Sequence, residues 1–188
     1  MQFPELTGKR IKLIHLSKKY LDDMYEYSRN PLMYRYFEFP VQKTKKETSV
    51  YLKKLIKRSN VGTAHYWFIS LRNSGKVIGS IGAHDIDWRK KNGEISYGLS
   101  PYHWGQGYFH ETLMLLLQFM FRKLSFHRIC AITRYDNLPS IKSLKRCGFK
   151  KEGRLRDFYL SHNGKRYDAV ILGLLRHEYH PQKARKQG

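Results

Sequence analysis

The stretch that decides the fold runs from Gly93 to Tyr108 and reads Gly-Glu-Ile-Ser-Tyr-Gly-Leu-Ser-Pro-Tyr-His-Trp-Gly-Gln-Gly-Tyr. Residues 94–99 follow a turn signal and are predicted to form a β-strand, which Ser100-Pro101 ends. A long helix is predicted over residues 110–124, because apolar side chains recur there on one helical face. The segment thus predicts a strand, a glycine-rich turn and a helix start in direct succession.

A helix that begins directly after a glycine turn is a general site for anions. Its first backbone N–H groups have no partner inside the helix, and the helix dipole adds partial positive charge. Gly105 and Gly107 permit a positive φ and allow a phosphate to approach the backbone closely. The spacing is neither that of a Walker A loop nor that of a three-glycine dinucleotide loop. On this signal alone, a purely structural turn explains the two glycines equally well.

The remaining elements follow from hydrophobic periodicity and from turn and capping signals. The predicted strands are residues 10–16, 66–71, 77–84, 94–99, 128–133, 154–160 and 167–175, and the predicted helices are residues 17–29, 44–58, 110–124 and 137–147. This order favours an α/β fold of the α+β type, with a mixed sheet and helices on its faces. Residues 1–179 are predicted to form one domain, and residues 180–188 a basic, flexible tail.

Composition narrows the function classes. The chain of 188 residues carries 36 basic and 15 acidic residues, a formal net charge of +21. Such a balance favours polyanionic partners such as RNA, ribosomes, acidic proteins or phosphorylated cofactors, although a solvated basic surface explains it too. No apolar run approaches the roughly 20 residues of a membrane span, and no signal-peptide pattern opens the chain. We therefore expect a soluble, cytoplasmic protein with no membrane partner.

The two cysteines, Cys130 and Cys147, are expected to be core thiols. Cys130 lies in a strand pattern, and Cys147 ends a short helix before Gly148-Phe149. Neither has His, Cys or acidic neighbours at ligand spacing, so no metal site is predicted.

Two motifs together resemble the GNAT superfamily of N-acetyltransferases, and within it the ribosomal-protein N-terminal acetyltransferases of the Rim type. The first is the strand-and-glycine segment quoted above, and the second is Asn137-Leu138-Pro139-Ser140 followed by Cys147-Gly148-Phe149 and Glu152-Gly153. The resemblance covers about residues 7–179. It implies a GNAT-like twisted sheet of about seven mostly antiparallel strands, in which the strands at 94–99 and 128–133 splay apart.

The resemblance also implies acetyl-coenzyme A as co-substrate. The pantetheine arm would lie in the opening and pair with the backbone near residues 97–100, and the pyrophosphate would rest on the amides of residues 106–110. The residues implied in coenzyme binding are Leu99, Ser100, Trp104, Gly105, Gln106, Gly107, Tyr108, Phe109, His110, Asn137 and Ser140. Two positions depart from the usual loop: Trp104 replaces a Gln or Arg, and Phe109 replaces a small residue.

Acetyl transfer to an amine needs a neutral amine, a polarised thioester carbonyl and a proton for the departing thiolate. By resemblance, the N–H near Leu99 polarises the carbonyl, and Glu94 accepts the proton of the amine. Glu94 is equally well explained as a carboxylate paired with a lysine. The usual tyrosine acid is missing, because Leu144 holds its position. Ser140, as acid or as helix cap, and Tyr97, as acid or as core residue, are the alternatives.

The function implied is transfer of an acetyl group from acetyl-coenzyme A to a primary amine, most simply the N-terminal amine of a protein. Two alternatives stay open: a small amine such as an aminosugar or antibiotic, or an aminoacyl-tRNA bound by an RNA-associated enzyme. The basic surface is a candidate contact for a ribosome or RNA. Either a monomer or a homodimer fits the sequence.

Overall fold

The computed structural model describes residues 3–180 and contains one eight-stranded sheet in the order β1-β2-β3-β4-β5-β6-β8-β7. All neighbouring strands are antiparallel except β5 and β6, which are parallel. The strands are β1 (Leu6–Thr7), β2 (Ile11–His15), β3 (His65–Leu71), β4 (Val77–Asp87), β5 (Asn92–Leu99), β6 (Arg128–Arg134), β7 (Lys150–Leu160) and β8 (Arg166–Leu175). The helices are α1 (Leu21–Ser28), α2 (Lys45–Ser59), α3 (Tyr108–Gln118) and α4 (Leu138–Arg146).

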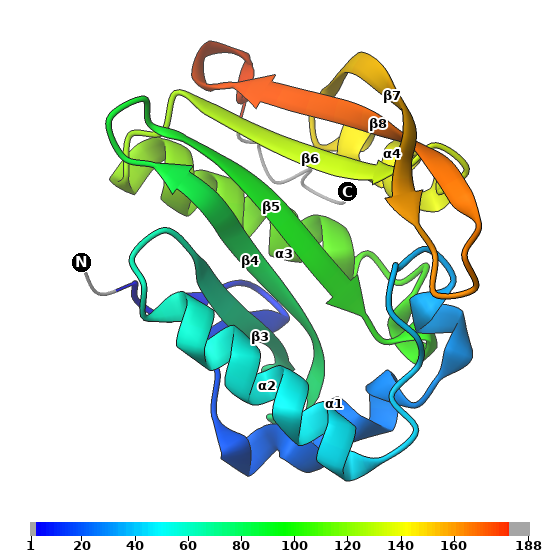
Figure 1. Ribbon diagram of the computed structural model, residues 1–188. Coiled ribbons are helices and arrows are strands. Elements are labelled where there is room, and N and C mark those ends of the chain that lie inside the picture. Colours follow the sequence, from blue (N-terminus) through cyan, green and yellow to red (C-terminus); the bar gives the residue numbers. More distant parts are fainter. Residues whose placement is uncertain (1–2, 181–188) are drawn as a thin grey trace.

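Two hydrophobic cores cover the two faces of the sheet, because neighbouring side chains of a strand point to opposite faces. On β3, Trp67 packs in the core that includes α3 and α4, whereas Phe68 packs in the core that includes α1 and α2. Figure 1 shows α3 behind the central strands and α2 in front of β3. The predicted mixed sheet with helices on its faces is confirmed.

The apolar stripe predicted on the long helix is confirmed as the centre of the larger core. Leu113, Leu116 and Leu117 have no exposed surface. The α-helix starts two residues earlier than predicted, because Gly107, with a φ of +79°, is its cap. It ends at Gln118, and a π-helical turn (Phe119–Lys123) carries the stripe onward.

Three other predicted elements differ in detail. The predicted helix at residues 17–29 is a 3₁₀ turn (Lys18–Tyr20), capped by Ser17, followed by α1. β7 begins at Lys150, four residues before the predicted start. β1 was not predicted, because a strand of two residues shows no readable periodicity. It brings the number of strands from the predicted seven to eight. The predicted tail lies outside the described residues beyond His180.

The sheet opens between β5 and β6. These strands pair only from Asn92 to Glu94 on β5, opposite Arg128 to Cys130 on β6, although both strands are longer. β6 pairs with β8 along its whole length, and β5 pairs with β4 almost throughout. The remaining half of β5 therefore has an unpaired edge facing the gap, and the predicted splayed pair is confirmed.

A test of this packing is truncation of the α3 stripe. Leu117→Ala is expected to lower the free energy of unfolding by about 2–5 kcal/mol, because the cavity cannot collapse around a fully buried leucine. The matched variant Gln118→Ala, at the exposed next position, should change it by less than about 0.5 kcal/mol. Urea unfolding measures both, and equal midpoints would contradict the packing described.

Candidate active site

The unpaired edge of β5 presents backbone groups to the gap. Ser100 donates its N–H to Ile78 O on β4 at 2.7 Å, and the hydrogen-bonding side of an antiparallel strand alternates residue by residue. Leu99 and Tyr97 therefore direct their N–H and C=O groups away from β4, toward β6. Since β6 has already separated there, the Leu99 N–H faces the gap with no strand partner in the described part of the chain. The gap belongs to a cavity of about 610 Å³.

The glycine loop stands at the end of this edge. Gly105 and Gly107 have φ angles of +74° and +79°, which L-residues with side chains rarely adopt. The amides from Gln106 to His110 donate no hydrogen bond to any group of residues 3–180, as expected for a helix start. Free amides at a helix start are the arrangement that an anion site requires, and binding of a phosphate there stays a prediction.

Arg10, just before β2, braces the loop, a role that the sequence did not reveal. Its guanidinium donates to Gln106 O at 3.0 Å and to Glu111 Oε2 at 2.9 Å, and it lies over the Tyr108 ring. Glu111 also accepts the Arg10 N–H. Burial raises the pKa of Glu111, but the hydrogen bonds from Arg10 outweigh it and lower the pKa. The pair thus fixes the first turn of α3 to the neighbouring strand.

Trp104 connects the loop to the β5 edge. Its indole Nε1 donates to Leu99 O at 2.7 Å, so the carbonyl is engaged while the Leu99 N–H stays directed into the gap. Phe109 does not point away from the site: its ring packs on Tyr97 with centroids 4.3 Å apart. The two residues that depart from the usual loop thus both line the cavity.

Tyr97 and Ser140, predicted as separate acid candidates, contact each other. The Tyr97 hydroxyl and Ser140 Oγ are 2.6 Å apart, and burial raises the pKa of Tyr97. Ser140 is not the helix cap, which corrects that alternative: Asn137 caps α4 with its side-chain oxygen on Ser140 N. Asn137 Nδ2 donates to Thr133 Oγ1 at 3.0 Å, which ties α4 to β6.

Two other predicted coenzyme contacts are constrained by their surroundings. Ser100 is buried, its N–H bonds Ile78 O, and its carbonyl accepts from the N–H of His103. Both backbone groups of Ser100 thus already have a hydrogen-bond partner, and its assignment as a coenzyme contact stays a prediction. His110 Nδ1 lies 3.2 Å from Cys147 Sγ, so the ring is engaged by this thiol. The backbone amide of His110 is then the group that can face a ligand at the loop. Cys147 is buried as predicted, whereas Cys130 is half-buried.

Glu94 lies where the paired part of β5 ends, inside the same cavity. Burial raises the pKa of its carboxyl, although nearby His84 lowers it. Its partner is not a lysine but His84, directly across on β4, with Nε2 3.9 Å from Glu94 Oε1. The His84 Nδ1 in turn contacts Asp85 Oδ2 at 2.8 Å. Sequence reasoning missed this cluster because a strand bulge brings Asp85 beside His84.

The other end of the cavity is closed by residues 32–39, a segment rich in aromatic side chains that follows α1. Its residues Met33 and Phe37 approach Gly98 of β5. Glu38 accepts the N–H of Leu160, and Arg134 donates to Arg35 O at 3.2 Å. Figure 1 shows this segment beside the β7–β8 turn. The segment therefore bridges the two halves of the sheet across the mouth of the gap.

A family profile described as the acetyltransferase (GNAT) domain matches residues 10–150, more than half of the chain. The chain belongs to the GNAT acetyltransferase family. The predicted resemblance is confirmed, and the matched range includes β2 to the end of α4, and hence the β5 edge and the glycine loop.

One relative is the uncharacterized N-acetyltransferase p20 of Bacillus licheniformis, 37% identical over 118 residues, which are 63% of this chain and 66% of p20. The chain thus spans just under two thirds of that relative's length. A GCN5-related N-acetyltransferase from Brucella melitensis superimposes with a TM-score of 0.86 at 22% identity, covering 95% of this chain and 81% of its own. RimL, the ribosomal L7/L12 alpha-N-protein acetyltransferase, solved with coenzyme A, superimposes with a TM-score of 0.82 at 20% identity, covering 92% and 98%. At these identities the two structures show the GNAT fold.

The brace on the GNAT loop can be tested through coenzyme binding. Arg10→Ala removes an ion pair and a bond to a loop carbonyl, together worth about 1–2 kcal/mol, so the Kd for coenzyme A should rise about tenfold. Isothermal titration calorimetry measures it, with the exposed neighbour Lys9→Ala as control. Equal affinities in the two variants would show that Arg10 does not order the loop.

Proposed function

We propose that this GNAT chain transfers an acetyl group from acetyl-coenzyme A to a primary amine, and that this amine is the N-terminus of a protein. The observation that carries the proposal is the β5 edge, where the Leu99 N–H faces the gap beside five loop amides that have no partner within residues 3–180. A thioester arm along this edge would end in a phosphate group at the helix start. Coenzyme A in RimL supports the choice of ligand.

Each requirement of acyl transfer has a candidate residue in the cavity. Acetyl-coenzyme A supplies an activated acetyl group and a thiolate as leaving group. The Leu99 N–H would donate to the thioester oxygen, as an oxyanion-hole donor does. Glu94 would take a proton from the arriving ammonium, since its raised pKa brings it closer to that of the amine. The Tyr97–Ser140 pair would protonate the departing thiolate from one of its hydroxyls.

The shape of the acceptor side favours a polypeptide over a small amine. The 610 Å³ cavity shares Phe39, Tyr51 and Arg58 with a second cavity of about 700 Å³ between α2 and the segment before it. The two cavities therefore adjoin, and in the proposed complex an acceptor chain would place its amine at Glu94 and its following residues toward the second cavity. A polyamine is disfavoured, because a chain of net charge +21 repels it.

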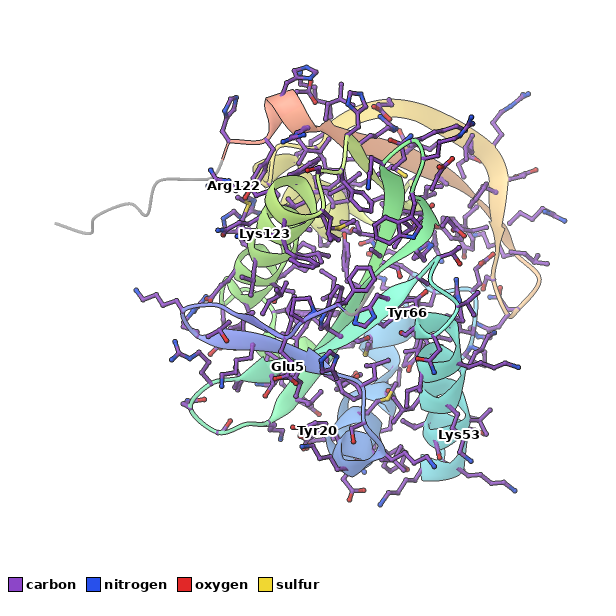
Figure 2. The ribbon with its side chains drawn as sticks, turned by 90° about the vertical axis from the view of Figure 1, so that its left-hand side faces the viewer. Glu5, Tyr20, Lys53, Tyr66, Arg122 and Lys123 are labelled. Carbon is purple, nitrogen blue, oxygen red and sulfur yellow. The ribbon has the colours of Figure 1, made fainter. Side chains whose placement is uncertain are left out.

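An acceptor carried on a ribosome or RNA would use the basic surface. α2 presents exposed lysines beside the second cavity, among them Lys53, which Figure 2 shows far from Arg122 and Lys123 in the π-helical turn after α3. Exposed basic side chains thus lie on separate parts of the surface, at α2 and at the turn after α3. If single-stranded RNA binds, log Kd should change with log salt by about 0.7 per phosphate contact. A flat salt dependence would remove RNA as a partner.

The activity itself is tested by thiol release from acetyl-coenzyme A. We expect release with peptides that have a free N-terminal amine, and none with the same peptides acetylated at that amine. Aminosugars and aminoacyl-tRNA serve as the competing acceptors. Release with either of these and none with peptides would contradict the proposed acceptor. No binding of acetyl-coenzyme A in calorimetry would contradict the proposal as a whole.

The acid is tested by a double-mutant cycle. Ser140→Ala and Tyr97→Phe should each lower kcat by about 10-fold to 100-fold, the range for a positioned proton donor. Because the two hydroxyls act through one hydrogen bond, the double variant should lose less than the product of the single losses. The Kd for coenzyme A should rise by a smaller factor than kcat falls, because a proton donor acts in the transition state. Unchanged turnover in Ser140→Ala would leave Ser140 without a chemical role.

A further inference from the structure

The end of β4 carries a bulge that no part of the proposed chemistry explains. His84 pairs with Glu94 and Asp87 pairs with Asn92, so Asp85 and Ile86 on β4 stand opposite Gly93 alone. Asp85 has a φ of +50°, the left-handed region that aspartate and asparagine tolerate best among residues with side chains. Successive side chains of a regular strand point to opposite faces, and bulges re-aim them. The bulge is what allows His84 and Asp85 to touch.

The three side chains form a line from the cavity to solvent. Glu94 and His84 expose 22% and 12% of their side chains, whereas Asp85 exposes 78%. His84 Nδ1 is 2.8 Å from Asp85 Oδ2, within hydrogen-bonding distance, and a neutral ring donates its Nδ1–H there. The Nε2 lone pair then faces the Glu94 carboxylate. Two acceptors without a shared proton do not attract, which fits their separation of 3.9 Å.

Other charged and titratable groups around this line are few. The Tyr66 ring of β3 stacks on the His84 ring, and Arg58 of α2 lies over Tyr66. On the β6 side, burial raises the pKa of Cys130 to about 11, so its thiol stays neutral. Burial likewise raises the pKa of Tyr159. Among the described residues, Glu94, His84 and Asp85 are therefore the imidazole and carboxyl groups that make up this line.

The reaction under the proposed function releases a proton that must leave the cavity. An ammonium and a thioester become an amide, a thiol and one proton: a C–N bond forms, a C–S bond breaks, and the nitrogen loses two protons. The thiolate takes its proton from the Tyr97–Ser140 pair, and one proton of the nitrogen restores that pair. Glu94 takes the other proton. Its side chain is largely shielded from water, and a protonated Glu94 cannot serve the next amine.

We propose that His84 and Asp85 carry this proton from Glu94 to solvent, which rests on the proposed acetyl transfer. Once protonated, Glu94 becomes a donor toward His84 Nε2, and His84 releases its Nδ1 proton to Asp85. The ring is then left with its proton on Nε2, and Asp85 gives the proton it received to water, so charge and protons balance. Exchange of the ring protons with water restores the Nδ1–H tautomer before the next turnover. His84 is a positioning and proton-transfer residue that acts through Glu94.

The test compares His84→Gln with His127→Gln, which removes an exposed histidine outside the cavity. With a free-amine peptide, His84→Gln should lower kcat about tenfold near pH 6.5 and progressively less above pH 8, where α-amines arrive neutral. The KM for acetyl-coenzyme A should not change, and His127→Gln should match the wild type. Asp85→Asn, which keeps the left-handed backbone, should show a smaller loss with the same pH dependence.

Chemical rescue separates proton transfer from packing. In His84→Ala, added imidazole should raise kcat in proportion to its basic form, because the ring it replaces was a base. A loss that is equal at every pH, or no rescue in a variant whose circular dichroism and coenzyme affinity match the wild type, would overturn the relay. So would activity that a chelator abolishes and Zn²⁺ restores, since the ligand atoms of these three side chains lie within 4.8 Å of one another. A wild-type protein that acetylates no amine would instead overturn the proposed function.

Discussion

The structure depends on one constraint: β5 and β6 are parallel neighbours that can pair only at their first three residues. Each is held on its other side by an antiparallel partner along almost its full length, so the two cannot close the gap without breaking those ladders. The strands are joined through α3, whose leucine stripe packs beneath both. The opening is therefore maintained by the rest of the sheet, and the unused hydrogen-bonding capacity of β5 is available to a ligand.

The charge balance of the glycine loop depends on the ion pair between Arg10 and Glu111. A carboxylate in the first turn of a helix, such as Glu111, would compete with a phosphate for the positive helix start. Arg10 neutralises it and holds it on the side of β2. The amides from Gln106 to His110 then keep their full attraction for an anion. Loop geometry and charge balance thus depend on a residue nearly a hundred positions earlier in the chain.

Most of the fold could be predicted from the sequence because its signals are local: the capping box at Thr44 and Glu47, the glycines of the loop and the α3 stripe are each readable from spacing. The site could be predicted only in part. Long-range partners such as Arg10 with Glu111, or Tyr97 with Ser140, leave no mark in local sequence. The contact of His84 with Asp85 needs a strand bulge, whereas alternation places neighbouring side chains on opposite faces. The motif also does not distinguish Leu99 from Ser100, whereas strand alternation turns the Ser100 N–H toward β4 and leaves the Leu99 N–H facing the gap.

The bond from the Trp104 indole to Leu99 O has a consequence for self-association. An unpaired strand edge with both donors and acceptors free is a template for a strand of another molecule. With Leu99 O already bonded, and with Met33 and Phe37 lying over Gly98, that edge offers an incoming strand no continuous ladder. The protein can therefore keep an open sheet edge at its centre, accessible to a slender ligand, without inviting aggregation through it.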